Sequence, residues 1–166
     1  MIDIALESDG DWDSIGAPLP ALAERALGAA IAESAYPHLA ACDRELEVSV
    51  ALTDDEAVRA LNAEWRSKDK ATNVLSFPMM DHDDLTQTDG PPALLGDIAL
   101  AYGVCGHEAG EKGVALADHA THLMVHGMLH LLGYDHQDDG SAHDMEARET
   151  RALARLGIAD PYGEAA

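Results

Sequence analysis

The sequence predicts an α/β (α+β) fold in which about four strands form one mixed sheet and helices pack on it. Segments 2–7 and 45–52 alternate apolar and polar residues, the period of a strand with one buried face. Segments 21–35 and 116–132 instead repeat their apolar residues every three or four positions, which indicates helices. A chain of 166 residues is long enough for one core and too short for two, so residues 1–166 are predicted to form a single domain.

The first half of the chain carries a start or stop signal at each predicted element. These elements are a strand over 2–7, a helix over 21–35, a strand over 45–52 and a helix that runs to about residue 66. The dipeptide Tyr36-Pro37 ends the first helix, because proline disfavours helical backbone at the residue before it. Thr53 and Glu56 have the spacing of a capping box, so we expect Thr53 to cap the second helix.

The second half of the chain is predicted to hold two strands and two helices. They are a strand over 74–77 stopped by Pro78, a strand over 96–102, a helix over 116–132 ended by Gly133, and a helix from Ser141 to about residue 156. Residues 81–92 are rich in Asp, Thr, Gly and Pro. We expect a solvated loop there, and a lid over a site is the alternative.

Composition predicts a cytoplasmic protein without an export signal or a membrane segment. The acids among residues 1–7 stand where a secretory signal needs basic residues, and no run reaches the roughly 20 apolar residues that span a bilayer. Cys42 and Cys105 lack the spacing of a metal or redox pair. Both are predicted to be reduced, buried thiols.

The charge of the chain limits how it could hold nucleic acid. A net charge of −21 argues against the broad basic face that gains from counterion release. Four of the ten basic residues nevertheless gather in one stretch, namely Arg59, Arg66, Lys68 and Lys70. We therefore expect a local anion site at most, and the alternative is a solvated helix end.

Three histidines have the spacing of ligands to one metal ion. His126 and His130 lie one helical turn apart on one face of the helix over 116–132. Gly133 follows where the chain must leave the helix, and the fold-back there can bring His136 to the same point. The pattern H-x-x-x-H-x-x-G-x-x-H is that of metzincin proteases, whose three protein ligands leave one metal position open for catalysis. The sequence therefore predicts a catalytic metal site on a central helix and the turn after it.

His119 and His122 lie on the same helical stripe, so the register of the ligands has to be tested. His122 and His126 would need a third ligand at position 132, which is Leu132, and this excludes the shifted register. We expect His119 and His122 to be exposed or capping residues, with a supporting role beside the ligands as the alternative. The other four histidines fit no pattern and are expected at the surface.

The protease interpretation fails at the residue after the first ligand. Metzincins have a glutamate there that takes a proton from the metal-bound water, whereas this chain has Gly127. Loss of a general base lowers a rate by about 10²–10⁴-fold. The metal site is therefore predicted without peptide chemistry, and a peptidase with its base elsewhere is kept as one alternative.

Three segments of the chain resemble the YbeY family of bacterial endoribonucleases, also described as rRNA maturation factors. They are residues 126–136, HGMLHLLGYDH; residues 62–78, which contain NAEWR and TNVLSFP; and residues 95–98, LGDI. The resemblance spans residues 46–146. The chain departs from the family's usual residues at Trp65, Asn73 and Glu146, none of which is a predicted ligand.

The resemblance implies a metal-dependent endoribonuclease specific for single strands. The substrate it implies is ribosomal RNA, in 16S rRNA 3′-end maturation and ribosome quality control, with small-subunit components as partners and neither DNA nor membrane. It also implies one Zn²⁺ per chain, which would be held by His126, His130 and His136. A non-catalytic ribosome assembly factor with a structural metal is the second alternative.

The resemblance further implies that Arg66 lines the metal cleft and is needed for activity. A guanidinium suits that role, because its planar fork of donors matches a phosphate and does not lose its charge. Ser76, Asp97 and Asp135 are further candidates. Asp135 could orient a ligating imidazole, whereas Asp97 could simply cap a turn.

Overall fold

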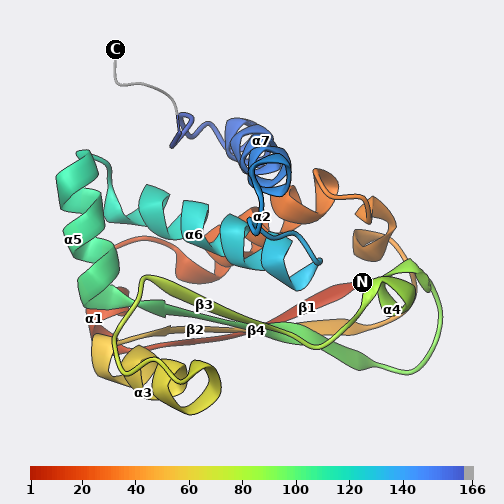
Figure 1. Cartoon of the computed structure of the whole chain (residues 1–166), viewed down its shortest axis with the longest axis horizontal. Coiled ribbons are helices and arrows are strands. Elements are labelled where there is room, and N and C mark those ends of the chain that lie inside the picture. The colour runs from red at the N-terminus through yellow and green to blue at the C-terminus, as the bar shows by residue number, and fades with distance from the viewer. Residues whose placement is uncertain (163–166) are drawn as a thin grey trace.

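A four-stranded mixed sheet forms the centre of the computed structural model, which describes residues 1–162 (Figure 1). The strands are β1 (Ile2–Ser8), β2 (Leu46–Thr53), β3 (Val74–Pro78) and β4 (Ala93–Ala101), and they lie in the order β1-β2-β4-β3. Strands β1, β2 and β4 run parallel, whereas β3 pairs antiparallel with β4 at one edge. The predicted α/β class and its mixed sheet are confirmed.

Helices cover the two faces of the sheet unequally. The described helices are α1 (Gly10–Asp13), α2 (Leu19–Ala32), α3 (Asp55–Arg66), α4 (His82–Thr86), α5 (Tyr102–Lys112), α6 (Leu116–Leu131) and α7 (Asp139–Arg155), with a 3-10 turn η1 at Pro37–Ala40. In Figure 1, α2, α6 and α7 stack on one face, and α3 lies against part of the other. The second face therefore stays partly open.

The helix-covered face holds the hydrophobic core. Val48, Val50 and Leu52 of β2 point into this core, while the alternate residues Ser49 and Ala51 face the other side. Helix α6 is buried over most of its surface because it lies between the sheet and helices α2 and α7. Helix α6 is apolar, but neither it nor any other helix within residues 1–162 is long and apolar enough to cross a membrane.

Two helices begin at caps other than the predicted ones. The side chain of Asp54, not that of Thr53, caps α3 by accepting the Ala57 backbone N–H at 2.7 Å. Helix α7 begins after Asp138, whose side chain accepts the backbone N–H of Ser141 at 2.7 Å. In both cases a nearby aspartate takes the place of the predicted hydroxyl residue, because a carboxylate is an equally good or better cap.

Helix α5 was not expected from the sequence. Three glycines lower the helix propensity of this segment, and the strand predicted over 96–102 overlaps its first residue. Strand β4 in fact ends at Ala101. A tertiary contact starts the helix, since the Asp55 carboxylate of α3 accepts the Val104 backbone N–H at 3.1 Å.

Part of the predicted loop over 81–92 is a packed helix. Asp81 and Asp84 form a capping box for α4, and Leu85 of the same helix is buried in the core. The ring of His38 hydrogen-bonds the backbone oxygen of Leu85 at 2.9 Å. The expectation of a wholly solvated loop is therefore wrong for His82–Thr86.

Candidate metal centre

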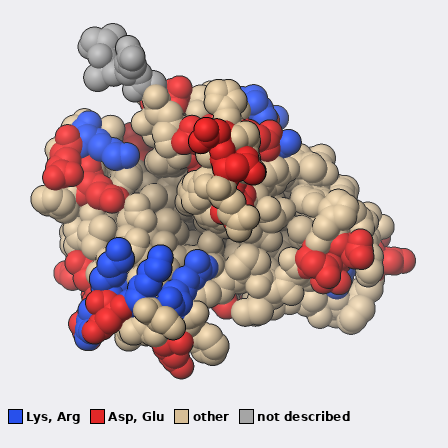
Figure 2. Space-filling view, viewed as in Figure 1, with Lys and Arg blue, Asp and Glu red and all other residues tan. Residues whose placement is uncertain are grey.

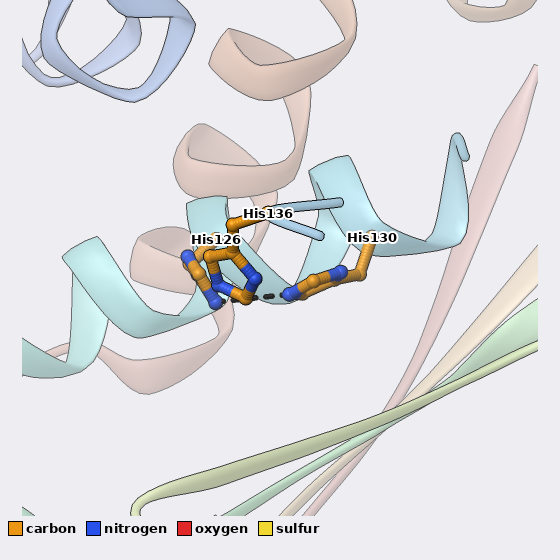
Figure 3. A group of neighbouring side chains, drawn as sticks. All are labelled: His126, His130 and His136. Atoms are coloured by element: carbon orange, nitrogen blue, oxygen red, sulfur yellow. Dashed lines mark hydrogen bonds between the residues drawn. The ribbon is translucent and has the colours of Figure 1, made fainter. Parts of the chain in front are cut away.

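Three imidazoles converge beside the second half of α6 (Figure 3). His126 and His130 project from this helix, and His136 comes from the loop that joins α6 to α7. One ligand nitrogen from each residue lies within 4.8 Å of the other two. The fold-back that brings His136 to the helix therefore occurs as the spacing predicts.

Gly133 makes the turn that carries the chain back toward the helix. Its φ of 93° lies in the left-handed region, where a residue with a Cβ is strained. Two backbone bonds close the turn as a Schellman motif: Gly133 N–H donates to the oxygen of His130, and Tyr134 N–H donates to that of Leu129, both at 3.0 Å. The glycine thus serves the position of His136 without touching it.

The donor set fits a divalent ion that prefers nitrogen. The Nε2 atoms of His126 and His130 lie 3.0 Å apart, close to the roughly 3.3 Å between two nitrogens on a tetrahedral zinc. Burial, followed by the charges of His126 and His136, lowers the pKa of His130 to about 4. This ring is therefore neutral at neutral pH and has a lone pair free for a metal.

A buried carboxylate holds the first of the three imidazoles. Glu149 of α7 is fully buried and accepts hydrogen bonds from Nδ1 of His126 and from the hydroxyl of Tyr162. Burial alone would raise the pKa of Glu149, but contacts with His122, His126 and Tyr162 outweigh it and lower the pKa to about 2. Because Nδ1 of His126 is the donor to this carboxylate, its Nε2 carries the lone pair that can bind a metal.

Glu149 is not among the residues predicted from the sequence, although a signal is present. The buried residues of α7 are Met145, Glu149, Ala152 and Leu153, so the glutamate lies on the apolar stripe of an amphipathic helix. A charge on such a stripe needs a buried partner. The pattern could have indicated that a partner exists, but not that it is His126, which lies 23 residues away.

Arg66 lies in the same cleft as the histidines. The cleft has a volume of about 450 Å³ and is lined by the three histidines, Arg66 and residues of β3. The Arg66 guanidinium donates to the backbone oxygen of Ser76 and lies 5.3 Å from the centre of the Phe77 ring. These two contacts hold an exposed guanidinium over the edge strand of the sheet.

The further candidates differ in where they lie. Ser76 and Asp135 line the cleft. Asp135 accepts the backbone N–H of His136 at 2.7 Å, and its Oδ1 lies 3.6 Å from the Nδ1 of that ring, close enough to influence its orientation. Asp97 neither lines the cleft nor caps a turn. It belongs to β4, and the alternation of the strand points it to the opposite face of the sheet.

His119 and His122 are buried, not exposed as expected. The ring of His119 hydrogen-bonds Glu108 of α5 at 2.9 Å, and burial lowers its pKa although the carboxylate opposes that shift. Nε2 of His122 lies 3.7 Å from Glu149. His122 therefore touches the carboxylate that holds His126, which puts it next to the three converging imidazoles but not among them.

Comparison with known proteins gives the relatives of the chain. Residues 21–157 match the family model described as Endoribonuclease YbeY. Proteins of that name from Erythrobacter litoralis and Rhizorhabdus wittichii are each 53% identical to this chain, over 98% of its length and over 96% and 97% of their own. One from Sinorhizobium fredii is 46% identical over 98% of this chain and 92% of its own length.

A solved structure shares the fold. A protein from Thermotoga maritima, determined in solution, aligns with a TM-score of 0.54 over 99% of this chain and 100% of its own. Because the two sequences are only 22% identical, this likeness concerns the fold alone.

Proposed function

The chain belongs to the YbeY endoribonuclease family, and from that premise we propose that it cleaves single-stranded RNA at a divalent ion held by His126, His130 and His136. The observation that carries the proposal is the meeting of three imidazoles and the Arg66 guanidinium in one cleft. A metal site and a phosphate contact are the two parts that hydrolysis of a phosphodiester most needs.

The histidines are the proposed ligands, and zinc is the proposed metal, at one ion per chain. Three imidazole donors are typical of catalytic zinc sites. When bound, such an ion supplies Lewis-acid activation of water and of a phosphoryl oxygen. Glu149 supports the site by holding His126 in the tautomer that presents Nε2 to the ligand cluster.

Arg66 is the proposed contact to the scissile phosphate. Its guanidinium is exposed in the cleft and offers a planar fork of N–H donors that matches a phosphate. The contacts with Ser76 and Phe77 orient the group before RNA arrives. A preorganised donor of this kind stabilises the negative charge that develops on the phosphoryl oxygens.

The proposed substrate is ribosomal RNA, in 16S rRNA 3′-end maturation and ribosome quality control in the cytoplasm, with small-subunit components as partners. Figure 2 shows that Lys and Arg side chains gather over α3 and the segment after it. On a chain of net charge −21, so small a basic region supports a short contact with an exposed strand. An extended grip on a duplex would need a wider basic face.

Metal-dependent cleavage tests the proposal. The full chain, purified without chelators, is analysed for metals and incubated with a single-stranded rRNA fragment. We expect about one zinc per chain, loss of cleavage after dialysis against a chelator, and recovery when zinc is returned. A chain that binds the fragment with its metal in place and never cuts it would favour a non-catalytic assembly factor, in which the metal only stabilises the fold.

Gly127 argues against a peptidase. It is buried on α6, and a Cβ added to it would lie 3.1 Å from Cγ2 of Ile98 in β4. A glutamate at this position would therefore require the Ile98 side chain to move. Cleavage of casein by the metal-loaded chain would contradict this reasoning.

A further inference from the structure

A second hollow lies on the face of the sheet that α6 does not cover. This hollow, termed the Trp65 groove, has a volume of about 410 Å³ and is bounded by α3 and the open part of the sheet. Its lining is mostly apolar, with two acidic residues. The lining residues that matter below are Trp65, Phe77, Met79, Glu7 and Asp97.

An exposed tryptophan marks the groove. The chain has two tryptophans, of which Trp12 is fully buried and Trp65 is 66% exposed. The single phenylalanine of the chain, Phe77, lines the same groove. Exposed aromatic faces beside an apolar floor are the surfaces on which unpaired nucleic-acid bases stack.

The groove and the metal cleft share one wall, the edge strand β3. Because side chains alternate along a strand, Ser76 and Pro78 line the cleft, whereas Phe77 and Met79 line the groove. Arg66 contacts both sides, since it donates to the backbone oxygen of Ser76 and lies 5.3 Å from the centre of the Phe77 ring. A strand of RNA held in the cleft can therefore reach the groove by crossing a single β-strand.

The charges around the groove attract a phosphate to one place and keep it out of another. Arg66, Lys68 and Lys70 follow Trp65 within five residues and are exposed, and neither lysine forms an ion pair within residues 1–162. Inside the groove lie the carboxylates of Glu7 and Asp97, which repel a phosphate. Phosphates are thus attracted to this basic segment, and the groove suits a neutral ring that carries an N–H donor.

We propose that the Trp65 groove binds one unpaired base of the RNA substrate, stacked on Trp65 and donating an N–H to Asp97, while Arg66, Lys68 and Lys70 hold the neighbouring phosphates. This binding site rests on the proposed function and sharpens its substrate class to a strand with a free base next to the cleaved phosphate. The Asp97 carboxylate accepts no hydrogen bond from residues 1–162, so its lone pairs are available to a ligand.

The carboxylate also gives the site a preference. Cytosine carries an amino donor where uracil carries a carbonyl acceptor, although the two rings have the same size for stacking. Uracil does have one N–H donor at N3, but it lies between two carbonyl oxygens that a carboxylate repels, whereas the cytosine amino group has a repelling acceptor on one side only. The site therefore prefers cytosine over uracil, and Asp97→Asn should reduce that preference without removing the stacking.

Tryptophan fluorescence tests the stacking directly, because the buried Trp12 gives a constant background. The full chain is titrated on ice with short single-stranded oligo(C) and oligo(U), and electrophoresis of the same samples checks that the RNA is intact. We expect quenching of the emission, with tighter binding of oligo(C). Anisotropy of labelled RNA should show binding weakened about tenfold or more in Trp65→Ala and largely kept in Trp65→Tyr.

The control variants separate this site from general charge effects. Lys68→Ala and Lys70→Ala should weaken binding and lower its salt dependence. Lys112→Ala changes another exposed lysine, at the C-terminal end of α5, and should leave the affinity unchanged. Because Trp65 is exposed, Trp65→Ala should also melt at the parental temperature, which excludes unfolding as the reason for weaker binding.

The outcomes distinguish this inference from the function on which it rests. A parental chain that neither binds nor cleaves RNA would refute both. A parental chain that cleaves RNA, with unquenched Trp65 and full affinity in Trp65→Ala, would overturn the base site alone. Protection of Trp65 from iodide by ribosomal proteins, and not by RNA, would assign the groove to a protein partner and overturn it as well.

Discussion

Helix α6 carries four histidines on one stripe, and its two halves use them in different ways. In the first half, His119 and His122 are buried against carboxylates of α5 and α7. In the second half, the Nε2 atoms of His126 and His130 lie 3.0 Å apart, and both residues line a cleft. The residue type and its helical spacing are the same. Neighbouring elements supply carboxylates to both halves, but only the second half also receives another imidazole, that of His136, and this decides what each ring can do.

The largest expected effect is the loss of metal from the second half of α6, while the first half stays intact. His130→Ala should reduce bound zinc from about one per chain to almost none and abolish RNA cleavage, because two imidazoles hold an ion far more weakly than three. His119→Ala is the matched variant and should keep both metal and cleavage while lowering the melting temperature, since it leaves the Glu108 carboxylate without its buried partner. Elemental analysis and thermal melts on both variants measure this. Full zinc in His130→Ala would remove that residue from the ligand set.

The next effect separates binding of the metal from chemistry at the phosphate. Arg66→Ala should lower the cleavage rate by about 10²–10³-fold and keep zinc content and melting temperature near the parental values. Arg66→Lys should recover only part of the rate, because an ammonium keeps the charge without the two-pronged geometry. Cleavage at the parental rate by the alanine variant would exclude Arg66 from the reaction, and loss of zinc would make it structural.

A smaller effect tests how the two halves are joined, because Glu149 contacts His122 in one and His126 in the other. Glu149→Gln should weaken zinc affinity by about 10–100-fold, since an amide is a poorer acceptor for the Nδ1 proton. Glu146→Gln alters the same helix one turn earlier and should leave the affinity unchanged. Competition with a chromophoric chelator measures both. Equal affinities would mean that the carboxylate serves only the fold.

The smallest expected effect is a pH dependence of folding to which both halves of α6 contribute. Burial lowers the pKa of His119 below its ordinary value of 6.5, and the pKa of His130 is lowered to about 4. The unfolded chain therefore binds protons that the folded chain does not once the pH falls below about 6.5, so the free energy of unfolding should decrease from there downward.

Urea unfolding of zinc-free protein at about pH 7.5 and about pH 5.5 measures that decrease. His119→Gln should reduce it, and the remainder belongs to His130. A free energy of unfolding that rises on acidification would contradict the assigned direction of both shifts.

Local patterns account for most of the fold that could be predicted. The helical repeat over 116–132 and the stop at Gly133 depend on residues within a few positions of each other, and the structure has both. Helix α5 could not be predicted in this way, because its three glycines disfavour a helix and its start is fixed by Asp55, a residue about fifty positions earlier. Contacts between distant segments override propensity at such places.

In the candidate site, too, the residues that follow from local spacing could be predicted, and those that depend on contacts between elements could not. The convergence of His126, His130 and His136 follows from spacing within one helix and turn, so the sequence could predict it. Arg66 was singled out through resemblance to a family, because no local pattern joins α3 to α6. Glu149 was missed altogether, since its partner lies on another helix. Spacing predicts which residues of one element face the same way, whereas only the packing shows which elements meet.

The antiparallel edge strand has a consequence for how the protein behaves in solution. Ala101 N–H donates to the oxygen of Asn73 at 3.0 Å, and Met79 N–H donates to that of Leu95 at 3.1 Å. In an antiparallel ladder, hydrogen-bonded pairs alternate with pairs whose backbone groups point away from the partner strand, and the alternation from Asn73 puts Ser76 in the second kind. The carbonyl of Ser76 is therefore on the free edge of the sheet.

A free edge is a template on which a second chain can add a strand and start aggregation. Two residues of this protein hinder such pairing at the free edge. Arg66 donates to the carbonyl of Ser76, and Pro78 lacks the N–H that an incoming strand would need. The guanidinium proposed to hold RNA thus also shields the sheet from self-association, so a change at Arg66 acts on solubility as well as on chemistry.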